Sequence, residues 1–252
     1  MSNFNIKNAK DITLDKSTYM IYAKPGTGKT HTLNYLPGRT LYLNVDKSER
    51  PLKGNENVDV LEFNTHDAWK EWTELMKWFN DNKEIVNQYD TIAIDNISEL
   101  FRSMLANLGR NGKNERVPEM SHYQRVDFFI IDSFRFLQSL GKRLVFIAWE
   151  TNYDFYTPSG QQITQSVPDV RKTIRDNIAG LCQVVAKLVF NEQSGNRGFI
   201  LMPSNSVFAK NQLDDREHCL QEDLFKIGDS DDTTSWLSNR VNQWRLSVDG
   251  QR

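Results

Sequence analysis

A glycine-rich turn near the amino end of the chain carries the residue types that bind phosphate. It ends in Lys29 and Thr30, and glycines occupy positions 26 and 28. Because glycine has no Cβ, backbone N–H groups at such a turn can point inward around an anion. The lysine would reach the terminal phosphates of a nucleotide, and the threonine hydroxyl would bind Mg²⁺. The candidate residues for binding ATP and Mg²⁺ are Ala23, Lys24, Pro25, Gly26, Thr27, Gly28, Lys29 and Thr30.

The surroundings of this turn favour a phosphate-binding loop over an isolated glycine turn. The pattern G-x-x-x-x-G-K-[ST] is met except at its first position, where Ala23 replaces glycine. The apolar residues 19–23 precede the turn as a strand would, and residues 28–36 have the character of a helix that Pro37 and Gly38 stop. The mechanism requires this context, because a helix directs its positive amino end at the anion. The alternative is a Gly-Pro turn with an unrelated lysine.

A second candidate is a short apolar strand that ends in a carboxylate. Residues 91–94 are mostly apolar, and Asp95 follows them. We expect this strand to lie beside the strand over residues 19–23, so that Asp95 reaches the Mg²⁺ shell opposite Thr30. Such runs are common in isolation, and the phosphate-binding turn gives this one its significance.

Length and composition limit the class of protein. The chain has 252 residues, which suits one large α/β domain or one domain with a small appendage. Its formal net charge is −2, so a surface for nucleic acid would have to be a local basic patch. Cys182 and Cys219 lack the spacing of a metal or redox site. No signal-peptide core or membrane-spanning run occurs, and we expect a soluble, cytoplasmic protein without a membrane partner.

Hydrophobic periodicity predicts strands that alternate with helices, which is typical of an α/β fold. Strands are expected over residues 40–45 and 58–63, followed by a helix over residues 67–86 with aromatic residues at helical spacing. Two further strands, over residues 184–190 and 198–202, are separated by a turn and predict a β-hairpin.

The predicted organisation is a core followed by a polar tail. The core spans residues 1–215 and begins with a short leading strand or amino-terminal arm over residues 1–17. It contains a mainly parallel sheet with helices on both faces, and the hairpin extends it. The tail spans residues 216–252, where Trp236 and Trp244 belong to a short amphipathic docking helix.

Two long polar stretches suggest a surface for single-stranded nucleic acid. Residues 108–118 are basic, and residues 151–162 form an aromatic loop. Cations would bind the sugar-phosphate backbone and rings would stack on bases. The alternative is two ordinary surface loops. The candidate DNA-binding residues are Arg110, Lys113, Arg116, Tyr153, Phe155 and Arg171.

Together these elements resemble the RecA superfamily, and within it the short, core-only RecA-like ATPases of phages that act in single-strand annealing or recombination. The resemblance rests on residues 23–30, the strand ending at Asp46, residues 92–95, the strand ending at Glu150, and residues 209–211. It implies a RecA-like P-loop NTPase core that hydrolyses Mg·ATP under stimulation by single-stranded DNA. It also implies a homo-oligomeric ring or filament in the host cytoplasm, with a single-strand-binding protein as a candidate partner.

The resemblance assigns further roles at the catalytic centre. Glu49 looks like the carboxylate that polarises the attacking water, with Asp46 as the alternative, although relatives have Asp-x-Glu and this chain has Asp-x-x-Glu. Relatives often carry His or Gln at the end of the later strand, where this chain has Trp149 and Glu150. Lys210 resembles the cation that one subunit presents to the nucleotide of its neighbour; the alternative is a solvated lysine. The candidate catalytic residues are Lys29, Glu49, Asp95 and Lys210.

Two other functions fit parts of the sequence. An ATP-dependent structural or loading protein for a helicase or a single-strand-binding protein would bind nucleotide with little hydrolysis. A small-molecule kinase is disfavoured because no arginine-rich lid is recognisable. ATP hydrolysis measured with and without single-stranded DNA separates the loading protein from an annealing ATPase.

Overall fold

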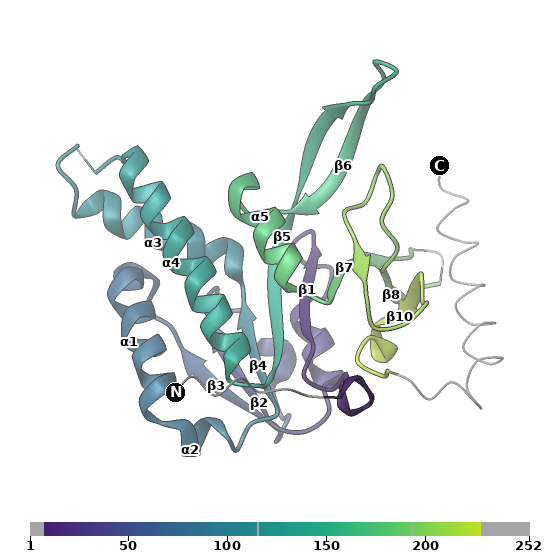
Figure 1. Ribbon diagram of the computed structural model, residues 1–252, viewed down its shortest axis with the longest axis horizontal. Coiled ribbons are helices and arrows are strands. Elements are labelled where there is room, and N and C mark those ends of the chain that lie inside the picture. Colours follow the sequence, from purple (N-terminus) through teal and green to yellow (C-terminus); the bar gives the residue numbers. More distant parts are fainter. Residues whose placement is uncertain (1–7, 115, 193, 228–252) are drawn as a thin grey trace.

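The computed structural model describes residues 8–114, 116–192 and 194–227, and Figure 1 shows its elements. The strands are β1 (Thr18–Ala23), β2 (Thr40–Asn44), β3 (Val58–Glu62), β4 (Thr91–Asp95), β5 (Arg143–Tyr156), β6 (Gln162–Pro168), β7 (Val184–Phe190), β8 (Arg197–Ile200), β9 (Lys210–Asn211) and β10 (His218–Leu220). The α-helices are α1 (Ala68–Asp81), α2 (Lys83–Val86), α3 (Ile97–Arg110), α4 (Met120–Ser139) and α5 (Lys172–Leu181). The 3₁₀ helices are η1 (Ala9–Asp11), η2 (Thr30–Tyr35), η3 (Arg50–Leu52), η4 (Thr65–Asp67) and η5 (Gln221–Asp223).

The central strands of the sheet run parallel in the order β3, β2, β4, β5, β1 and β7. Parallel strands bring their carboxyl ends to one edge, and the register sets Ala23 opposite Trp149 and Asp95 opposite Ile147. The loop after β1 and the ends of β2 and β4 therefore lie at the same edge. This is the edge at which open parallel sheets bind their ligands.

The strand order corrects one prediction. β4 does not lie beside β1, because β5 is inserted between them and pairs with both. The first six residues of β5 are all buried, and strands covered on both faces occupy the middle of a parallel sheet. The order of such strands depends on which surfaces pack together, and periodicity along the chain does not encode it.

The two faces of the sheet are covered differently. One face packs against α1, α3, α4 and α5, and its core includes the fully buried Trp72 and Phe134. The aromatic face of α1 is therefore part of the core. The other face packs against short 3₁₀ turns through Leu33, Leu52 and Leu224.

The segment after the glycine-rich turn is shorter and tighter than the predicted helix over residues 28–36. It forms η2, which ends before Pro37. Thr32 and Asn34 have low helix propensity, and the nearby proline limits extension, so that only 3₁₀ turns form.

The carboxyl-terminal part of the sheet is antiparallel. β7 and β8 form the predicted hairpin, and β10 adds to its outer side. Cys219, Leu224 and Phe225 are buried. Residues 218–225 thus belong to the core, beyond the boundary expected after residue 215, because their side chains cover the second face of the sheet.

A projecting β-hairpin replaces the aromatic loop predicted over residues 151–162. β5 continues past the sheet and pairs with β6 from Glu150↔Pro168 to Tyr156↔Gln162, and Figure 1 shows this pair rising from the body of the molecule. We call β5 from Glu150 onward, with β6, the arm. Tyr153 and Phe155 alternate with exposed residues, as in a two-faced strand.

The remaining predictions concern the ends of the chain and the basic stretch. Residues 8–17 contain the turn η1, while residues 1–7 and the predicted docking helix with Trp236 lie outside the described residues. The basic stretch connects α3 to α4, and Arg110 is the last residue of α3. Within the described residues, no helix is both long enough and apolar enough to cross a membrane.

Candidate functional site

The turn after β1 has the backbone of a closed anion-binding loop. Gly26 and Gly28 have φ angles of 79° and 103°, which side chains with a Cβ rarely adopt. The Lys29 ammonium donates to the carbonyl oxygens of Ala23 (3.0 Å) and Lys24 (3.1 Å) at the start of the loop. The lysine therefore folds back across the loop, where a bound phosphate would exchange for these carbonyl partners.

Thr30 and Asp95 meet at the carboxyl edge of the sheet. Thr30 Oγ1 donates to Asp95 Oδ2 at 2.6 Å. The same carboxylate oxygen accepts from Ser48 Oγ at 3.1 Å and from the hydroxyl of Tyr42 at 3.3 Å. The three hydroxyl groups come from η2, β2 and the segment after β2. They hold the carboxylate in one position.

Burial shapes the electrostatics of this cluster. Asp95 is 1% exposed, and desolvation, with the nearby charge of Asp46, raises its pKa to about 6. Desolvation also lowers the pKa of Lys29, against the opposing charges of Asp95 and Asp46. Both groups therefore carry charge at a cost that a bound phosphate and cation would offset.

The oxygen atoms near Asp95 suit a hard cation. Asp46 Oδ1 and Asn44 Oδ1 are buried without a hydrogen-bond partner among the described residues, while the other carboxylate oxygen of Asp46 accepts from the Asn96 amide. Carboxylate, hydroxyl and carbonyl oxygens are the ligands that Mg²⁺ prefers. Thr30 and Asp95 would hold Mg²⁺, and the unpartnered oxygens offer acceptors for its water ligands.

Glu49 lies beside this cluster but is held by another side chain. Its Oε2 accepts from Asn44 Nδ2 at 2.8 Å, and the same amide nitrogen lies 3.2 Å from Glu62 Oε1. Glu62 also forms an ion pair with Lys47. One amide therefore links the candidate base to a second carboxylate at the end of β3.

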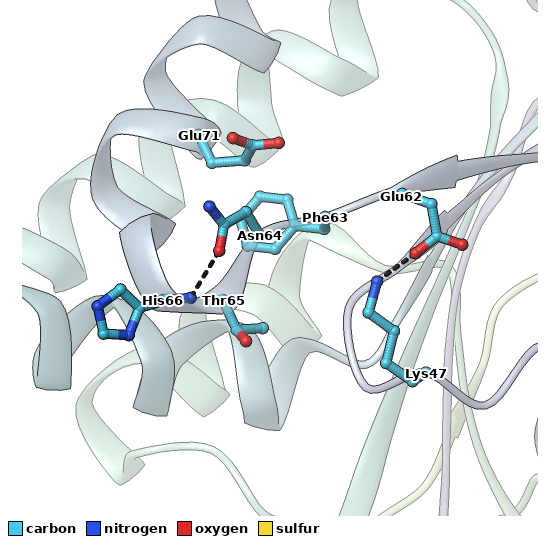
Figure 2. Close-up of a pocket in the computed structure, with 7 residues that line it drawn as sticks. All are labelled: Lys47, Glu62, Phe63, Asn64, Thr65, His66 and Glu71. Atoms are coloured by element: carbon cyan, nitrogen blue, oxygen red, sulfur yellow. Dashed lines mark hydrogen bonds and ion pairs between the residues drawn. The ribbon is translucent and has the colours of Figure 1, made fainter.

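The Lys47–Glu62 pair forms one wall of a pocket of about 400 Å³. Figure 2 shows this pair on one side and His66 with Glu71 on the other. The pocket lies at the carboxyl end of β3, outside the Thr30–Asp95 cluster. None of the predicted nucleotide-binding residues lines this pocket.

Glu150 is paired with a residue that the sequence analysis did not single out. Its side chain, 6% exposed, accepts from Ser166 Oγ at 2.8 Å and lies 3.1 Å from Lys187 Nζ. Lys187 pairs with Tyr22 on β1, so the ion pair bridges β7 and β5 across the end of β1. A lone lysine within the apolar run of residues 184–190 was the available signal, because a partly buried cation needs a partner.

The candidate DNA-binding residues divide into free and engaged groups. Lys113 and Arg116 are exposed between α3 and α4, while Arg110 donates to the carbonyl of His66. Arg171 forms two hydrogen bonds, of 2.8 and 2.7 Å, with the carboxylate of Asp127. Its charge is therefore largely balanced within the chain.

Tyr153 and Phe155 lie on the same face of the arm. Their rings are stacked with centroids 6.5 Å apart. Lys172 Nζ donates to the Tyr153 hydroxyl at 2.7 Å, and the Arg175 guanidinium lies 5.2 Å from the ring centroid. The Tyr153 ring thus lies beside two cations of α5, of which Lys172 is exposed and Arg175 is buried.

Lys210 lies away from the loop of its own chain. It pairs with Val185 near the amino ends of β7 and β1, at the edge opposite the loop. Its ammonium donates to the carbonyl oxygens of Ala179, Gly180 and Cys182 at the end of α5. Lys210 therefore caps α5 here, and its role in a neighbouring subunit's site remains a prediction.

The fold and the site define a P-loop NTPase with a RecA-like core: a mostly parallel sheet, a glycine-rich loop after β1 and Asp95 at the same edge. A family model described as an AAA domain matches residues 15–213, and the chain belongs to this family.

Comparisons with individual proteins add little beyond the family. No curated protein matches the chain. A similar solved structure is that of a KaiC-like protein from the hyperthermophilic archaeon Pyrococcus horikoshii, at 11% identity and a TM-score of 0.39, covering 73% of this chain and 77% of that chain.

Proposed function

We propose that the chain is an ATPase that binds Mg·ATP and acts on single-stranded DNA during annealing or recombination in phage DNA metabolism. The observation that carries the nucleotide-dependent part is the 2.6 Å hydrogen bond between Thr30 and Asp95, with Lys29 folded over the adjacent loop. A hydroxyl, a carboxylate and a lysine in this relation are the groups that bind the metal and the terminal phosphates of a nucleotide.

Each group has a distinct task in this proposal. Backbone N–H groups of the loop and Lys29 bind the phosphates, and Thr30 and Asp95 hold the cation. When bound, Mg²⁺ supplies positive charge to the terminal phosphates. Glu49, at the end of the neighbouring strand, orients water, and Asn44 sets the position of its carboxylate. Asp46 stays the alternative base, since one of its oxygens accepts from Asn96 and the other has no hydrogen-bond partner among the described residues.

The DNA-binding part rests on the arm and the basic stretch. Tyr153 and Phe155 offer ring surfaces with the exposed Lys172 beside them, while Arg175 is buried and pairs with Asp176. In Figure 1 the connection between α3 and α4 and the arm both extend from the upper part of the molecule. Rings and cations on segments that leave the body of the protein suit a flexible single strand, since bases stack while phosphates contact charge.

Steady-state ATP hydrolysis with and without single-stranded DNA tests the proposal. We expect Mg²⁺-dependent turnover that DNA stimulates, and DNA binding that ATP strengthens. Lys29→Ala is the matched control, since it removes the phosphate-binding ammonium alone. Turnover that survives this substitution, or DNA that neither binds nor stimulates, would overturn the corresponding part of the proposal.

A second function is favoured by one observation. The Oε2 atom of Glu49 already accepts a hydrogen bond from Asn44, so this oxygen is not free to orient water. A nucleotide-dependent structural or loading protein for a helicase or a single-strand-binding protein would need ATP binding without rapid turnover. Tight Mg·ATP binding together with negligible hydrolysis in the presence of DNA would favour this alternative.

A further inference from the structure

The carbonyl groups of the phosphate loop are held from outside the parallel core. In a loop whose N–H groups converge on an anion, carbonyl oxygens must point outward and find other donors. Arg197 Nε donates to the carbonyl of Thr27 at 2.6 Å. Gln221 Nε2 donates to the carbonyl of Gly28 at 2.9 Å and to Thr32 Oγ1 at 2.8 Å.

Both donors come from the antiparallel extension of the sheet. Arg197 opens β8, and Gln221 opens η5 directly after β10. β8 and β10 pair with each other, so the two donors are carried by neighbouring parts of the extension. Gln221 also lies beyond residue 213, where the family match ends. The extension therefore contacts two successive peptide groups immediately before Lys29.

Arg197 is fixed against the loop. Its guanidinium lies 4.9 Å from the centroid of the Phe190 ring, and a Cβ built on Gly28 would lie 3.0 Å from Arg197 Nε. A hydrogen bond from a guanidinium is stronger than one from a neutral amide, and its charge adds to the positive potential of the loop. Gln221 is 5% exposed, so its amide has little freedom to exchange partners with water.

We propose that Arg197 and Gln221 are positioning residues that hold the phosphate loop in its anion-binding shape, and that the antiparallel extension thereby sets nucleotide affinity. This inference rests on the proposed nucleotide binding. A loop that is held before the ligand arrives loses less conformational entropy on binding, which raises affinity. The positive charge of Arg197 contributes to the same end without being one of the phosphate ligands.

The test measures affinity for a fluorescent ADP analogue, with Mg²⁺, in the full-length protein. We expect Arg197→Ala to weaken binding by at least about tenfold, the effect of one charged hydrogen bond, and Gln221→Ala by about fivefold. Arg197→Lys should fall between wild type and Arg197→Ala, because it keeps charge without the guanidinium geometry. Lys226→Gln is the control, since it removes a cation of the same segment that pairs with Asp223.

Thermal unfolding of the nucleotide-free variants separates positioning from general stability. Variants that unfold at lower temperature, yet bind ADP with wild-type affinity when measured well below that temperature, would show a merely structural role and overturn the inference.

Thr32→Val provides a milder probe, because it removes one acceptor of Gln221 and keeps the buried volume. We expect a twofold to fivefold loss of affinity, which corresponds to about half to one times the free energy of a neutral hydrogen bond. If the wild-type protein itself does not bind ADP or ATP, the proposed function fails instead.

Discussion

Thr30 Oγ1 donates a 2.6 Å hydrogen bond to Asp95 Oδ2, although 65 positions separate them in the chain. Their segments are also separated in the sheet, because β5 lies between β1 and β4. The hydroxyl at the start of η2 therefore crosses the end of β5 to reach the carboxylate. The two groups that would share a cation already lie together, so binding requires no rearrangement of the strands.

Lys29→Ala should remove the stabilisation by Mg·ATP while leaving the fold intact. The ammonium contacts two carbonyl groups of its own loop, and its loss relieves a buried charge. A ligand at a hundred times its Kd raises the free energy of unfolding by about 2.7 kcal/mol. Thermal unfolding with and without Mg·ATP measures the difference. An equal shift in wild type and variant would contradict the assignment of the loop.

Asp95→Asn should raise the stability of the nucleotide-free protein at neutral pH. Burial and the charge of Asp46 raise the pKa of Asp95 from 3.8 to about 6. The stability that the protonated Asp95 contributes is therefore fully present below about pH 4 and is lost as pH rises through 6. Each pKa unit is worth about 1.4 kcal/mol, which makes the total on the order of 3 kcal/mol. The amide can still accept from Thr30.

Thermal unfolding at pH 5 and pH 7.5 tests this prediction. The decrease in stability between the two values should be smaller in Asp95→Asn than in wild type. Stabilisation by Mg·ATP should decrease in the same variant, since the carboxylate would hold the metal. A variant with the wild-type pH dependence would show that Asp95 is ionised without cost.

Glu49→Gln should lower the rate of ATP hydrolysis while leaving nucleotide affinity near the wild-type value. The carboxylate lies beside the cluster and contacts Asn44 rather than the loop. General-base catalysis contributes a factor of roughly 10²–10⁴ to the rate. The single-turnover rate of hydrolysis should therefore decrease by a factor within this range. Asp46→Asn serves as the comparison. Normal turnover in Glu49→Gln with a large loss in Asp46→Asn would transfer the role of base to Asp46.

The arm and the basic stretch should each weaken DNA binding when altered. Tyr153→Ala or Phe155→Ala should cost about 1–3 kcal/mol of binding free energy if either ring stacks on a base. Tyr153→Phe is the control, because it keeps the ring and removes only the hydroxyl that contacts Lys172. Fluorescence anisotropy with a labelled single strand gives the affinities; wild-type affinity in both alanine variants would exclude the arm.

Neutralising Arg110, Lys113 and Arg116 together should flatten the salt dependence of DNA binding. The slope of log affinity against log salt should change by up to about 0.7 for each lost phosphate contact. A control that neutralises the exposed lysines 70, 77 and 83 of α1 and α2 removes the same charge from another surface. If both sets change the slope equally, the effect is one of net charge.

Lys210 offers a test of assembly. If Lys210 acts on the nucleotide of a neighbouring subunit, a mixture of Lys210→Ala and Lys29→Ala subunits should recover part of the ATPase activity that each variant lacks alone. The first variant keeps an intact phosphate loop, and the second keeps an intact Lys210. The ammonium must first leave the carbonyl groups at the end of α5. Lys210→Met keeps the aliphatic stem and removes only the ammonium, so it controls for lost side-chain packing. Normal hydrolysis by Lys210→Ala would exclude the trans role.

The phosphate loop, the strand ending at Asp95 and the β7–β8 hairpin were predictable because each is a local pattern. Glycine at positive φ, an apolar run and a polar turn between apolar strands are specified by neighbouring residues. The arm was missed because its two strands are recognisable only through their mutual pairing. A polar, aromatic strand that leaves the sheet has the composition of a loop.

Tertiary structure alone decided which distant groups meet at the loop. The position of β5 between β1 and β4, the contact of Arg197 with Thr27, and the place of Lys210 at the opposite edge all depend on strand order. Strand order follows from how buried surfaces pack across the sheet, which is a property of pairs of segments far apart in the chain. Residue types and spacing therefore determined the chemistry available at this edge, whereas packing determined which side chains hold it in place.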